Sequence, residues 1–369
     1  MSVVIVGAGQ AGFQVAWSLR TEGYDGSITL IGEERHLPYQ RPPLSKGFLL
    51  GKQELGHTVL RPEKFYQDQR IDLILGERVE SVRGLVELES GPKIPYDHLV
   101  LATGARVRQL HGDFLYLRGS EDALRLKDRL DRANSVAVIG GGFIGLEVAA
   151  AARMLGKDVT VLELQPRLMS RSVSPAISEF FRELHTSEGV RLLFGQGETP
   201  SADLTVAGIG VIPNVELALD AGLPVGNGIS VDEHLRTANE RMFAIGDCAA
   251  HPVLGRLESV QNAVDQARCV AANITGKAQR YAAVPWFWTD QFDAKLQMAG
   301  LSFGADQTSI RGAPPKFSVF YFRENRLIAV DSINRPGDHI AARKLLATGA
   351  AISPDQASDE SFALTSLIC

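Results

Sequence analysis

Two stretches of the chain repeat the same order of apolar and polar positions. In the first, an apolar run at 3–6 stops at a glycine-rich turn, a helical pattern of apolar positions follows, and a second apolar run spans 28–31. In the second, an apolar run at 135–139 leads through another glycine-rich turn and an alanine-rich helical pattern to 158–162. A strand, a turn, a helix and a strand in this order are typical of a βαβ unit. The chain is therefore predicted to contain two such units.

Later apolar runs extend this prediction to a complete fold. Three of them, at 99–104, 204–210 and 242–247, end abruptly in small residues, as strands do at the C-terminal edge of a parallel sheet, where ligands bind in open α/β folds. From about Pro285, short alternating segments at 317–322 and 327–330 predict a small, mostly antiparallel domain. We therefore predict an α/β fold with two Rossmann-like dinucleotide-binding domains and a small α+β C-terminal domain.

Composition narrows the class of protein. The length of 369 residues predicts two or three domains, and the 45% hydrophobic and 22% charged residues are typical of a soluble globular protein. A formal net charge of −5 gives no support to nucleic-acid binding. The apolar runs are shorter than the roughly 18 residues of a transmembrane helix, and a strand that begins at Ser2 leaves no room for a targeting peptide. We expect a cytoplasmic protein without a membrane partner.

The cysteines exclude several kinds of site. Only Cys248, Cys269 and Cys369 occur, and none of them lies in a C-x-x-C pair. Neither a redox-active disulfide nor a zinc or iron–sulfur site is indicated, so we expect no metal. Each cysteine is interpreted as a small buried or terminal thiol.

The first glycine-rich turn has the residue types that a dinucleotide requires. Gly7 makes the tight turn, Gly9 lets the backbone approach a pyrophosphate, and Gly12 lets the helix pack on the strand. The helix that follows presents its first N–H groups to the diphosphate. Glu33, at the end of the next strand, is placed to bind an adenosine ribose. A distant Gly246-Asp247 follows another strand and can bind ribityl hydroxyls, so this copy is assigned to FAD.

The second copy, at 140–145, is assigned to the nicotinamide dinucleotide. Glu163 occupies the ribose position, where a carboxylate binds a free 2′-hydroxyl and repels a 2′-phosphate. NADH is therefore favoured over NADPH. Arg167 follows four residues later and is interpreted as a solvated surface arginine.

Several segments outside the two turns carry a family resemblance. The most specific are Arg-Pro-Pro-Leu-Ser-Lys at 41–46 and Pro-Trp-Phe-Trp-Thr-Asp-Gln at 285–291; others lie at 101–105, 208–214, 244–248 and 258–263. With these segments the chain resembles the pyridine nucleotide-disulfide reductase-like flavoproteins, whose domains are of the glutathione reductase type. It is most similar to the putidaredoxin reductase-like NADH-dependent ferredoxin reductases, which include the reductase components of dioxygenases.

The resemblance implies a set of cofactor-binding residues. For FAD they are Gly9, Ala11, Gly12, Glu33, Arg41, Lys46, Val79, Ala102, Thr103, Gly104, Arg118, Gly246, Asp247, Val260 and Trp288. For NADH they are Gly142, Ile144, Gly145 and Glu163. Lys46, Glu147 and Trp288 are the implied catalytic residues. Lys46 supplies positive charge near the isoalloxazine, Glu147 pairs with it at the nicotinamide face, and Trp288 lies beside the flavin ring.

The same resemblance implies the domains and the reaction. An FAD-binding domain spans 1–106 and 235–284, an NADH-binding domain 107–234, and a C-terminal interface domain 285–369. The implied enzyme is an oxidoreductase that transfers electrons from NADH through FAD to a 2Fe-2S ferredoxin, which supplies a P450 or a Rieske-type oxygenase. A monomer or a weak homodimer is expected. Because such ferredoxins are usually acidic, docking requires a local basic patch; the candidates are Arg61, Lys64, Arg70, Arg106, Arg108 and Arg311.

Two alternative functions share this fold; the sequence excludes one of them and leaves the other open. Disulfide reductases and NADH oxidases or peroxidases need a cysteine early in the chain, and none precedes Cys248, so that class is excluded. An apoptosis-inducing-factor-like NADH-binding redox sensor with low turnover stays open. Reduction of cytochrome c by NADH, with and without an added ferredoxin, distinguishes the sensor from the reductase.

The chain departs from the family in its loops. Between 195–197 and 202–204 the family normally has a β-meander of roughly three strands, whereas only Glu-Thr-Pro-Ser at 198–201 intervenes here. Smaller losses occur near 83–84 and 109–113. We expect the missing meander to weaken the packing of the NADH-binding domain more than it weakens FAD binding.

Overall fold

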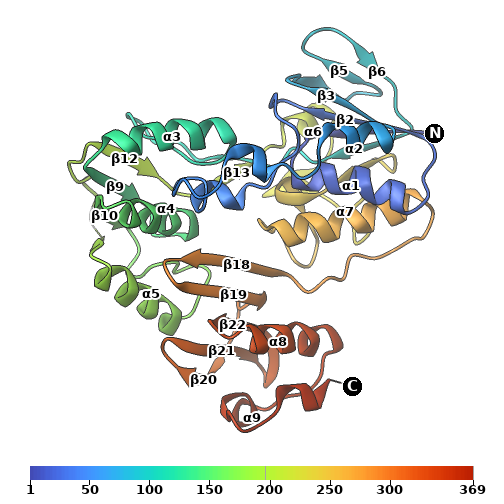
Figure 1. The fold of residues 1–369 in the computed structure, drawn as a ribbon. Coiled ribbons are helices and arrows are strands. Elements are labelled where there is room, and N and C mark those ends of the chain that lie inside the picture. The colour runs from blue at the N-terminus through green and yellow to red at the C-terminus, as the bar shows by residue number, and fades with distance from the viewer. Residues whose placement is uncertain (196, 369) are drawn as a thin grey trace. The chain divides into compact units, whose positions relative to one another are not determined.

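The computed structural model describes residues 1–195 and 197–368 (Figure 1). The chain divides into two compact units. The first unit contains Met1–Gln40, Leu55–Arg106 and Val211–Ala283, and the second contains Arg41–Glu54, Val107–Gly210 and the chain from Val284 onward. The division into three domains stays a prediction. Gln196 in the shortened connection and the Cys369 thiol lie outside the described residues.

The first unit is built on a parallel five-stranded sheet with the order β16-β7-β1-β2-β3. Its strands are β1 (Ser2–Val6), β2 (Ser27–Gly32), β3 (Ile71–Leu75), β7 (His98–Leu101) and β16 (Met242–Ala244). The central strands are apolar on both faces because helices cover a sheet of this kind. Two of these helices, α1 (Gln10–Thr21) and α7 (Val260–Ile274), pack against each other (Figure 1). The first predicted βαβ unit, β1-α1-β2, is thereby confirmed.

Shorter elements complete the first unit. One antiparallel sheet has the order β4-β5-β6, and another small sheet has the order β14-β15-β17. The bounds are β4 (Val79–Ser81), β5 (Val86–Leu88), β6 (Lys93–Ile94), β8 (Ala105–Val107), β13 (Val211–Pro213), β14 (Val225–Gly226), β15 (Gly228–Ser230), β17 (Ala249–Ala250), α2 (Glu63–Asp68), α6 (Glu216–Asp220), η2 (Leu55–Thr58) and η3 (Gly246–Cys248). Strand β8 continues by one residue into the second unit.

The second unit contains the other predicted βαβ unit, β9-α4-β10. A parallel four-stranded sheet has the order β11-β10-β9-β12. Its strands are β9 (Ser135–Ile139), β10 (Asp158–Glu163), β11 (Arg191–Phe194) and β12 (Leu204–Ala207). The helices are α3 (Ser120–Arg132), α4 (Phe143–Met154) and α5 (Pro175–Ser187), and the 3-10 helix η1 (Pro42–Ser45) comes from the early part of the chain.

The C-terminal part of this unit is an antiparallel sheet with the order β18-β19-β22-β21-β20. The bounds are β18 (Trp286–Gln291), β19 (Ala294–Gly300), β20 (Gln307–Ala313), β21 (Lys316–Arg323), β22 (Arg326–Ile333), α8 (Pro336–Thr348), α9 (Pro354–Ser358) and η4 (Leu364–Leu367). Helix α8 packs on β19 and β22, and Phe320, Phe322 and Leu345 are buried in the core between them (Figure 1). The predicted α/β fold with an antiparallel C-terminal domain is confirmed.

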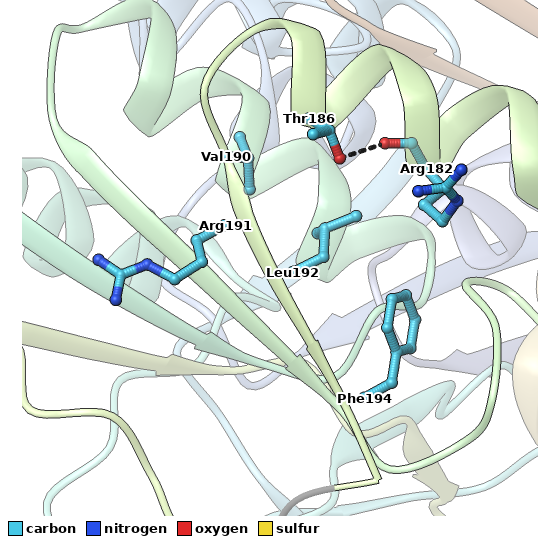
Figure 2. Close-up of a pocket in the computed structure, with 6 residues that line it drawn as sticks. All are labelled: Arg182, Thr186, Val190, Arg191, Leu192 and Phe194. Atoms are coloured by element: carbon cyan, nitrogen blue, oxygen red, sulfur yellow. Dashed lines mark hydrogen bonds between the residues drawn. The ribbon is translucent and has the colours of Figure 1, made fainter.

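Strand β11 is an edge strand of its sheet, and the shortened connection follows it directly. A shallow hollow lies between this strand and α5, lined by Arg182, Thr186, Val190, Arg191, Leu192 and Phe194 (Figure 2). Leu192 and Phe194 are only half-buried along it. This is the place where the family's meander would follow. Its effect on packing stays a prediction.

The structure also bears on membranes, metals and thiols. Among residues 1–195 and 197–368, no helix is long and apolar enough to cross a bilayer. Over the same ranges, no group of three metal-ligating side chains comes together. Cys248 and Cys269 are free and buried, which confirms their interpretation as buried thiols. Burial raises the pKa of Cys269 to about 12.

Candidate functional site

The carboxyl ends of the parallel strands in the first unit carry most of the residues expected to bind FAD. Strands β1, β2, β7 and β16 all end at one edge of the sheet. The loops and helix starts that follow this edge contain Gly9, Ala11, Gly12, Glu33, Ala102, Thr103, Gly104, Gly246 and Asp247. Val260 begins α7 and Val79 begins β4 in the same unit. Segments far apart in the sequence thus meet where open α/β sheets bind ligands.

The geometry of the first glycine-rich turn fits a dinucleotide pyrophosphate. Gly7 has a φ of +112°, and a Cβ there would overlap the carbonyl of Ala102. A Cβ on Gly12 would overlap the carbonyl oxygen of Gly7, so the helix could not approach the strand as closely. At Gly9, in contrast, the space that a Cβ would occupy is open, and this residue caps α1 without a side chain. The turn leaves room and N–H donors for a diphosphate at the helix start.

Two polar side chains that were not predicted as site residues hold the neighbouring loops. Asn214 Nδ2 donates to the Thr103 carbonyl over 2.9 Å, and Thr103 Oγ1 donates to the Asn214 carbonyl over 2.7 Å. Gln266 of α7 accepts from Gly246 N over 2.7 Å. Each of these bonds joins segments that are distant in the sequence or on different elements, and no local pattern marks them. Their effect is to fix the backbone on which Gly104 and Asp247 stand.

The second glycine-rich turn repeats this geometry. Gly142 caps α4 with open space at its Cβ position, whereas a Cβ on Gly145 would overlap the carbonyl oxygen of Gly140. The side chain of Ile144 is exposed on the first turn of α4. Glu163 stands beside the turn, with Oε2 accepting from Gly141 N and Oε1 from Gln165 N, both over 2.7 Å. The carboxylate is therefore fixed at the end of β10, as a ribose-binding group must be.

The interpretation of Arg167 as a solvated surface arginine is wrong. Its Nη1 donates to the Val173 carbonyl and to Ser178 Oγ, and its Nη2 donates to the Ser170 carbonyl, each over 2.7 Å. The chain after β10 folds around the guanidinium, which satisfies these carbonyls. Arg167 is thus held by protein groups near Glu163.

An ion pair joins Lys46, which follows η1, to the buried Glu147 of α4, one turn after the second glycine-rich turn. Lys46 Nζ is 2.8 Å from Glu147 Oε1, and the Glu147 side chain is 2% exposed. The predicted pairing of these two residues is confirmed; their catalytic role stays a prediction. Ser45 Oγ donates to Glu147 Oε2 over 2.5 Å, and Thr289 Oγ1 donates to Oε1 over 2.6 Å. Both hydroxyls belong to the most specific family segments, which was the signal that could have singled them out.

The remaining predicted residues of the second unit lie on β18 and beside η1. Trp288 is half-buried, and its ring centroid is 5.4 Å from that of Trp286. Arg41 Nη1 donates to the Arg118 carbonyl over 2.7 Å. Arg41, Lys46, Arg118 and Trp288 therefore belong to the same unit as Glu147. Their contacts with FAD stay a prediction.

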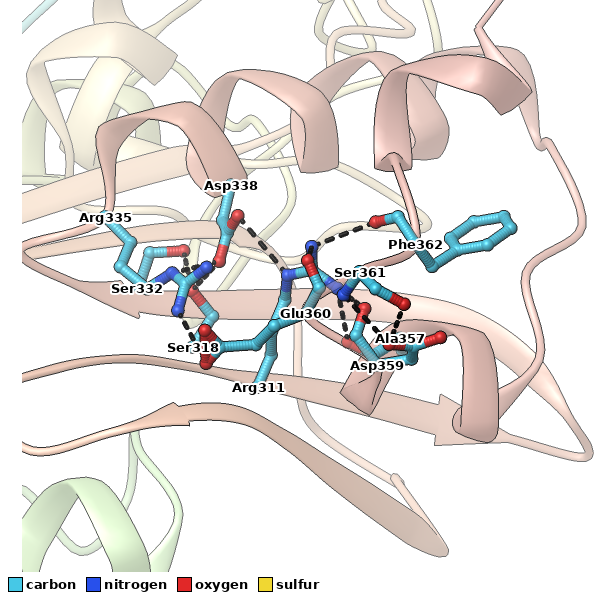
Figure 3. A network of polar contacts seen from close by, with 10 residues as sticks. All are labelled: Arg311, Ser318, Ser332, Arg335, Asp338, Ala357, Asp359, Glu360, Ser361 and Phe362. Carbon is cyan, nitrogen blue, oxygen red and sulfur yellow. Dashed lines mark hydrogen bonds and ion pairs between the residues drawn. The ribbon is translucent and has the colours of Figure 1, made fainter.

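One of the candidate docking residues is buried. Arg311 is 5% exposed and donates to backbone carbonyls of the C-terminal segment (Figure 3). Its inclusion in a basic surface patch is wrong, because the segment at 357–362 folds over β20 and covers it. Of the other candidates, Lys64, Arg70 and Arg106 form exposed ion pairs with acidic side chains. Arg61 lies over the Trp17 ring at 4.6 Å, and Arg108 is exposed.

His185 of α5 makes a pH-dependent contribution to stability. It is 0% exposed, and burial lowers its pKa to about 4 against the opposing effect of its bond to Gln291. In the unfolded chain the histidine binds a proton below about pH 6.5, whereas in the folded protein it stays neutral until the pH approaches about 4. The stability that His185 contributes is therefore fully present above about pH 6.5 and is lost as the pH falls toward about 4.

We expect His185→Gln to flatten the pH dependence of the free energy of unfolding by up to about 1.4 kcal/mol per pH unit between pH 6 and 5. Urea unfolding at both pH values measures the slope. Equal slopes in the two proteins would contradict the prediction.

Comparisons with known proteins agree with this geometry. The family model described as pyridine nucleotide-disulphide oxidoreductase matches residues 1–197 and 193–267, and the model described as reductase C-terminal matches residues 286–368. Rhodocoxin reductase from Rhodococcus erythropolis is 49% identical over 399 aligned positions, gaps included. The alignment covers 99% of this chain and 93% of that protein.

Solved structures extend the likeness to the fold. The ferredoxin reductase for the CYP199A2 system from Rhodopseudomonas palustris is 46% identical, has a TM-score of 0.96 and is matched over 100% of both chains. The reductase in a covalent putidaredoxin reductase–putidaredoxin complex is 40% identical with a TM-score of 0.95, over 100% of this chain and 98% of that one. Motifs, fold and relatives agree over the whole length, and the chain belongs to the pyridine nucleotide-disulphide oxidoreductase family, in which it is most similar to ferredoxin reductases.

Proposed function

We propose that this protein is an NADH-dependent ferredoxin reductase that transfers electrons through FAD to a 2Fe-2S ferredoxin, which supplies a P450 or a Rieske-type oxygenase. The observation that carries the proposal is the ion pair between Lys46, which follows η1, and the buried Glu147 of α4, the helix after the second glycine-rich turn. A chain without any cysteine before Cys248 cannot pass electrons to an early disulfide. The names of the relatives supply the acceptor: they are reductases of rhodocoxin and of ferredoxins.

Each of the two glycine-rich turns is assigned to one dinucleotide. We propose that the loops containing Gly9, Glu33 and Asp247 bind FAD, with contributions from Arg41, Lys46, Arg118 and Trp288. Gly142, Ile144, Gly145 and Glu163 bind NADH. Bound FAD supplies a carrier that takes two electrons together and releases them one at a time.

The protein's own residues orient the two bound dinucleotides and keep a positive charge in a fixed place. Transfer between two bound dinucleotides depends on orientation more than on proton transfer by the protein. Lys46 provides a fixed ammonium, and Glu147 keeps that ammonium in one place. The short, buried bonds to Glu147 keep its carboxylate from turning toward water.

The proposal extends to the partner and the assembly. An acidic ferredoxin would dock on exposed basic side chains, of which Arg108 is a candidate. We propose a monomer or a weak homodimer, with the three domains as predicted. A cytoplasmic location is part of the proposal, because the NADH pool is there.

Two measurements test the function. The purified protein should be yellow, and its flavin absorbance should bleach when NADH is added without oxygen. NADH-driven reduction of cytochrome c should then depend on an added 2Fe-2S ferredoxin. Slow turnover with every acceptor, ferredoxin included, would favour the redox-sensor alternative and overturn the proposal.

The choice of NADH over NADPH provides a further prediction. Glu163→Gln replaces one of the two acceptor oxygens that the backbone and a ribose use, and it removes the negative charge that repels a 2′-phosphate. We expect the ratio of kcat/KM for NADH to that for NADPH to fall about 10- to 100-fold, as expected for the loss of a hydrogen bond to a charged group. Glu188→Gln, at an exposed position of the same unit, makes the same change in net charge and should leave the ratio unaltered. An unchanged ratio in Glu163→Gln would show that another residue selects the coenzyme.

A further inference from the structure

We propose that Thr289 and Gln291 of β18, braced by His185 of α5, are positioning residues that fix the Glu147 carboxylate on Lys46. The inference rests on the proposed function, because it assigns a purpose to a network that ends on that ion pair. The bonds join four elements of the second unit: η1, α4, α5 and β18. His185 contacts neither the ion pair nor the glycine-rich turns directly; it is linked to Glu147 only through Gln291 and Thr289.

The network is a continuous line of hydrogen bonds. Thr289 Oγ1 is 2.6 Å from Glu147 Oε1. Gln291 Nε2 is 3.3 Å from Thr289 Oγ1. His185 Nε2 is 2.8 Å from Gln291 Oε1. The line therefore runs from His185 on α5, through two side chains of β18, to the Glu147 carboxylate on α4.

The chemistry of the groups gives every bond in this line a direction. An ionised carboxylate only accepts, so Thr289 must donate its single hydroxyl proton to Glu147. Thr289 Oγ1 is then left to accept from the Gln291 amide nitrogen, and the Gln291 amide oxygen accepts from His185. Burial lowers the pKa of His185 to about 4, so the ring is neutral and its proton must be on Nε2. This arrangement makes every bond in the line, and the Nδ1 atom of His185 is left buried without a hydrogen-bond partner.

Burial shows why this line is not an incidental set of core contacts. Thr289, Gln291 and His185 are 0%, 1% and 0% exposed, and Glu147 is 3% exposed. Buried polar groups are costly unless they are bonded, and linked bonds in a medium of low polarity reinforce one another. Apolar residues of similar size would fill the same space at lower cost. The polar residues therefore make sense where the orientation of one carboxylate matters.

The side chains of β18 alternate between two faces of the strand, and the two faces contact different groups. Side chains at 287, 289 and 291 lie on one face of the strand, and those at 286 and 288 on the other. The Phe287 ring is 4.8 Å from that of Phe143 on α4, so the first face packs toward the helix that carries Glu147. The other face carries Trp286 and Trp288. The same strand thus holds the ion pair on one side and the tryptophans on the other.

The proposal predicts how a loss of the hydroxyl affects the reaction. Thr289→Val keeps the shape of the side chain but leaves Glu147 Oε1 with Lys46 alone. We expect the limiting rate of flavin reduction by NADH to fall about tenfold or more, while the dissociation constant of NADH changes by less than about threefold. Thr289→Ser restores the hydroxyl and should restore most of the rate. Gln291→Glu cannot donate to Thr289 and offers a competing acceptor, so it should also slow reduction.

Stopped-flow absorbance at increasing NADH concentration separates the limiting rate from binding. Thr160→Val, on the buried strand β10 of the same unit, is the matched control and should react like the wild type. A limiting rate for Thr289→Val within about twofold of the wild type, or a failure of Thr289→Ser to restore it, would overturn the proposal.

A second readout does not depend on turnover. Thr289 and Lys46 both contact Glu147 Oε1, so their substitutions should be coupled in thermal unfolding if Thr289 holds Glu147 on Lys46. We expect the Tm shift of the double variant Lys46→Met/Thr289→Val to be smaller than the sum of the single shifts. Additive shifts would overturn the proposal. If the wild type itself failed to bleach with NADH, the proposed function would fall, and this unfolding comparison would still decide the positioning role.

Discussion

Replacement of Lys46 by methionine is expected to slow the reduction of bound FAD by NADH about 100- to 1,000-fold, the usual effect of removing a fixed charge that stabilises a reaction's developing charge. Methionine keeps the apolar stem of the side chain and removes only the ammonium. Electrons arriving at the flavin add negative charge, which a nearby fixed cation favours. FAD binding should change far less, because the glycine-rich turn and Asp247 belong to the first unit.

The same substitution leaves a buried carboxylate without its cation. Glu147 would keep its bonds to Ser45 and Thr289, but its 2% exposed side chain would have no access to a counter-charge. Breaking a buried pair in this way costs about 3 kcal/mol, and the 21% exposure of the Lys46 side chain favours the lower part of the range. A folded but less stable variant that is yellow and slow is therefore the expected result.

Stopped-flow absorbance under anaerobic conditions measures the rate, and the flavin content of the purified variant measures FAD retention. Lys64→Met removes a lysine from an exposed pair with Asp68 and serves as the control, since an exposed pair contributes little. Reduction of the Lys46→Met flavin at the rate of the wild type would show that the ammonium has no part in the transfer.

The local parts of this site could be predicted from the sequence. Strand, turn and helix follow one another within about thirty residues, and the roles of Gly7, Gly9 and Gly12 depend on backbone geometry that every such turn shares. Glu163 was predictable for the same reason. The pairing of Lys46 with Glu147 was different, because nothing local connects residues so distant in the chain. Only the family resemblance indicated it.

Contacts between distant segments were beyond the reach of sequence patterns. Thr289 and Gln291 lie in a segment of the family resemblance, but nothing local indicates their bonds to α4 and α5, and a buried histidine on a helix leaves no periodic signal. Arginines were misread in the same way. A charged side chain is usually exposed, and neither Arg167 nor Arg311 carries a mark of the carbonyls that surround it in the fold.

A second large effect is expected where Arg311 holds the C-terminal segment on β20 (Figure 3). Its Nη2 donates to the Phe362 carbonyl over 2.9 Å and to the Glu360 carbonyl over 3.2 Å, and its Nη1 donates to the Asp359 carbonyl. Its Nε is 3.7 Å from Asp338 Oδ1, whose other oxygen accepts from Arg335 Nε over 2.7 Å. One guanidinium therefore donates to three carbonyls of the bend that follows α9.

We expect Arg311→Met to reduce the free energy of unfolding of the C-terminal part by about 3 kcal/mol, because it removes the guanidinium from the Glu360 and Phe362 carbonyls and leaves Asp338 with a single cation. Arg311→Lys should recover little of the loss, since an ammonium cannot reach several carbonyls in one plane as a guanidinium does.

Urea unfolding and the rate of proteolysis between 350 and 368 measure the effect, and Arg326→Met, at an exposed position, is the control. Flavin reduction by NADH should stay close to the wild-type rate, because Glu147 and Lys46 receive their bonds from other elements. If Arg311→Met unfolded at the same urea concentration as the wild type, water would have to satisfy those carbonyls in place of the guanidinium.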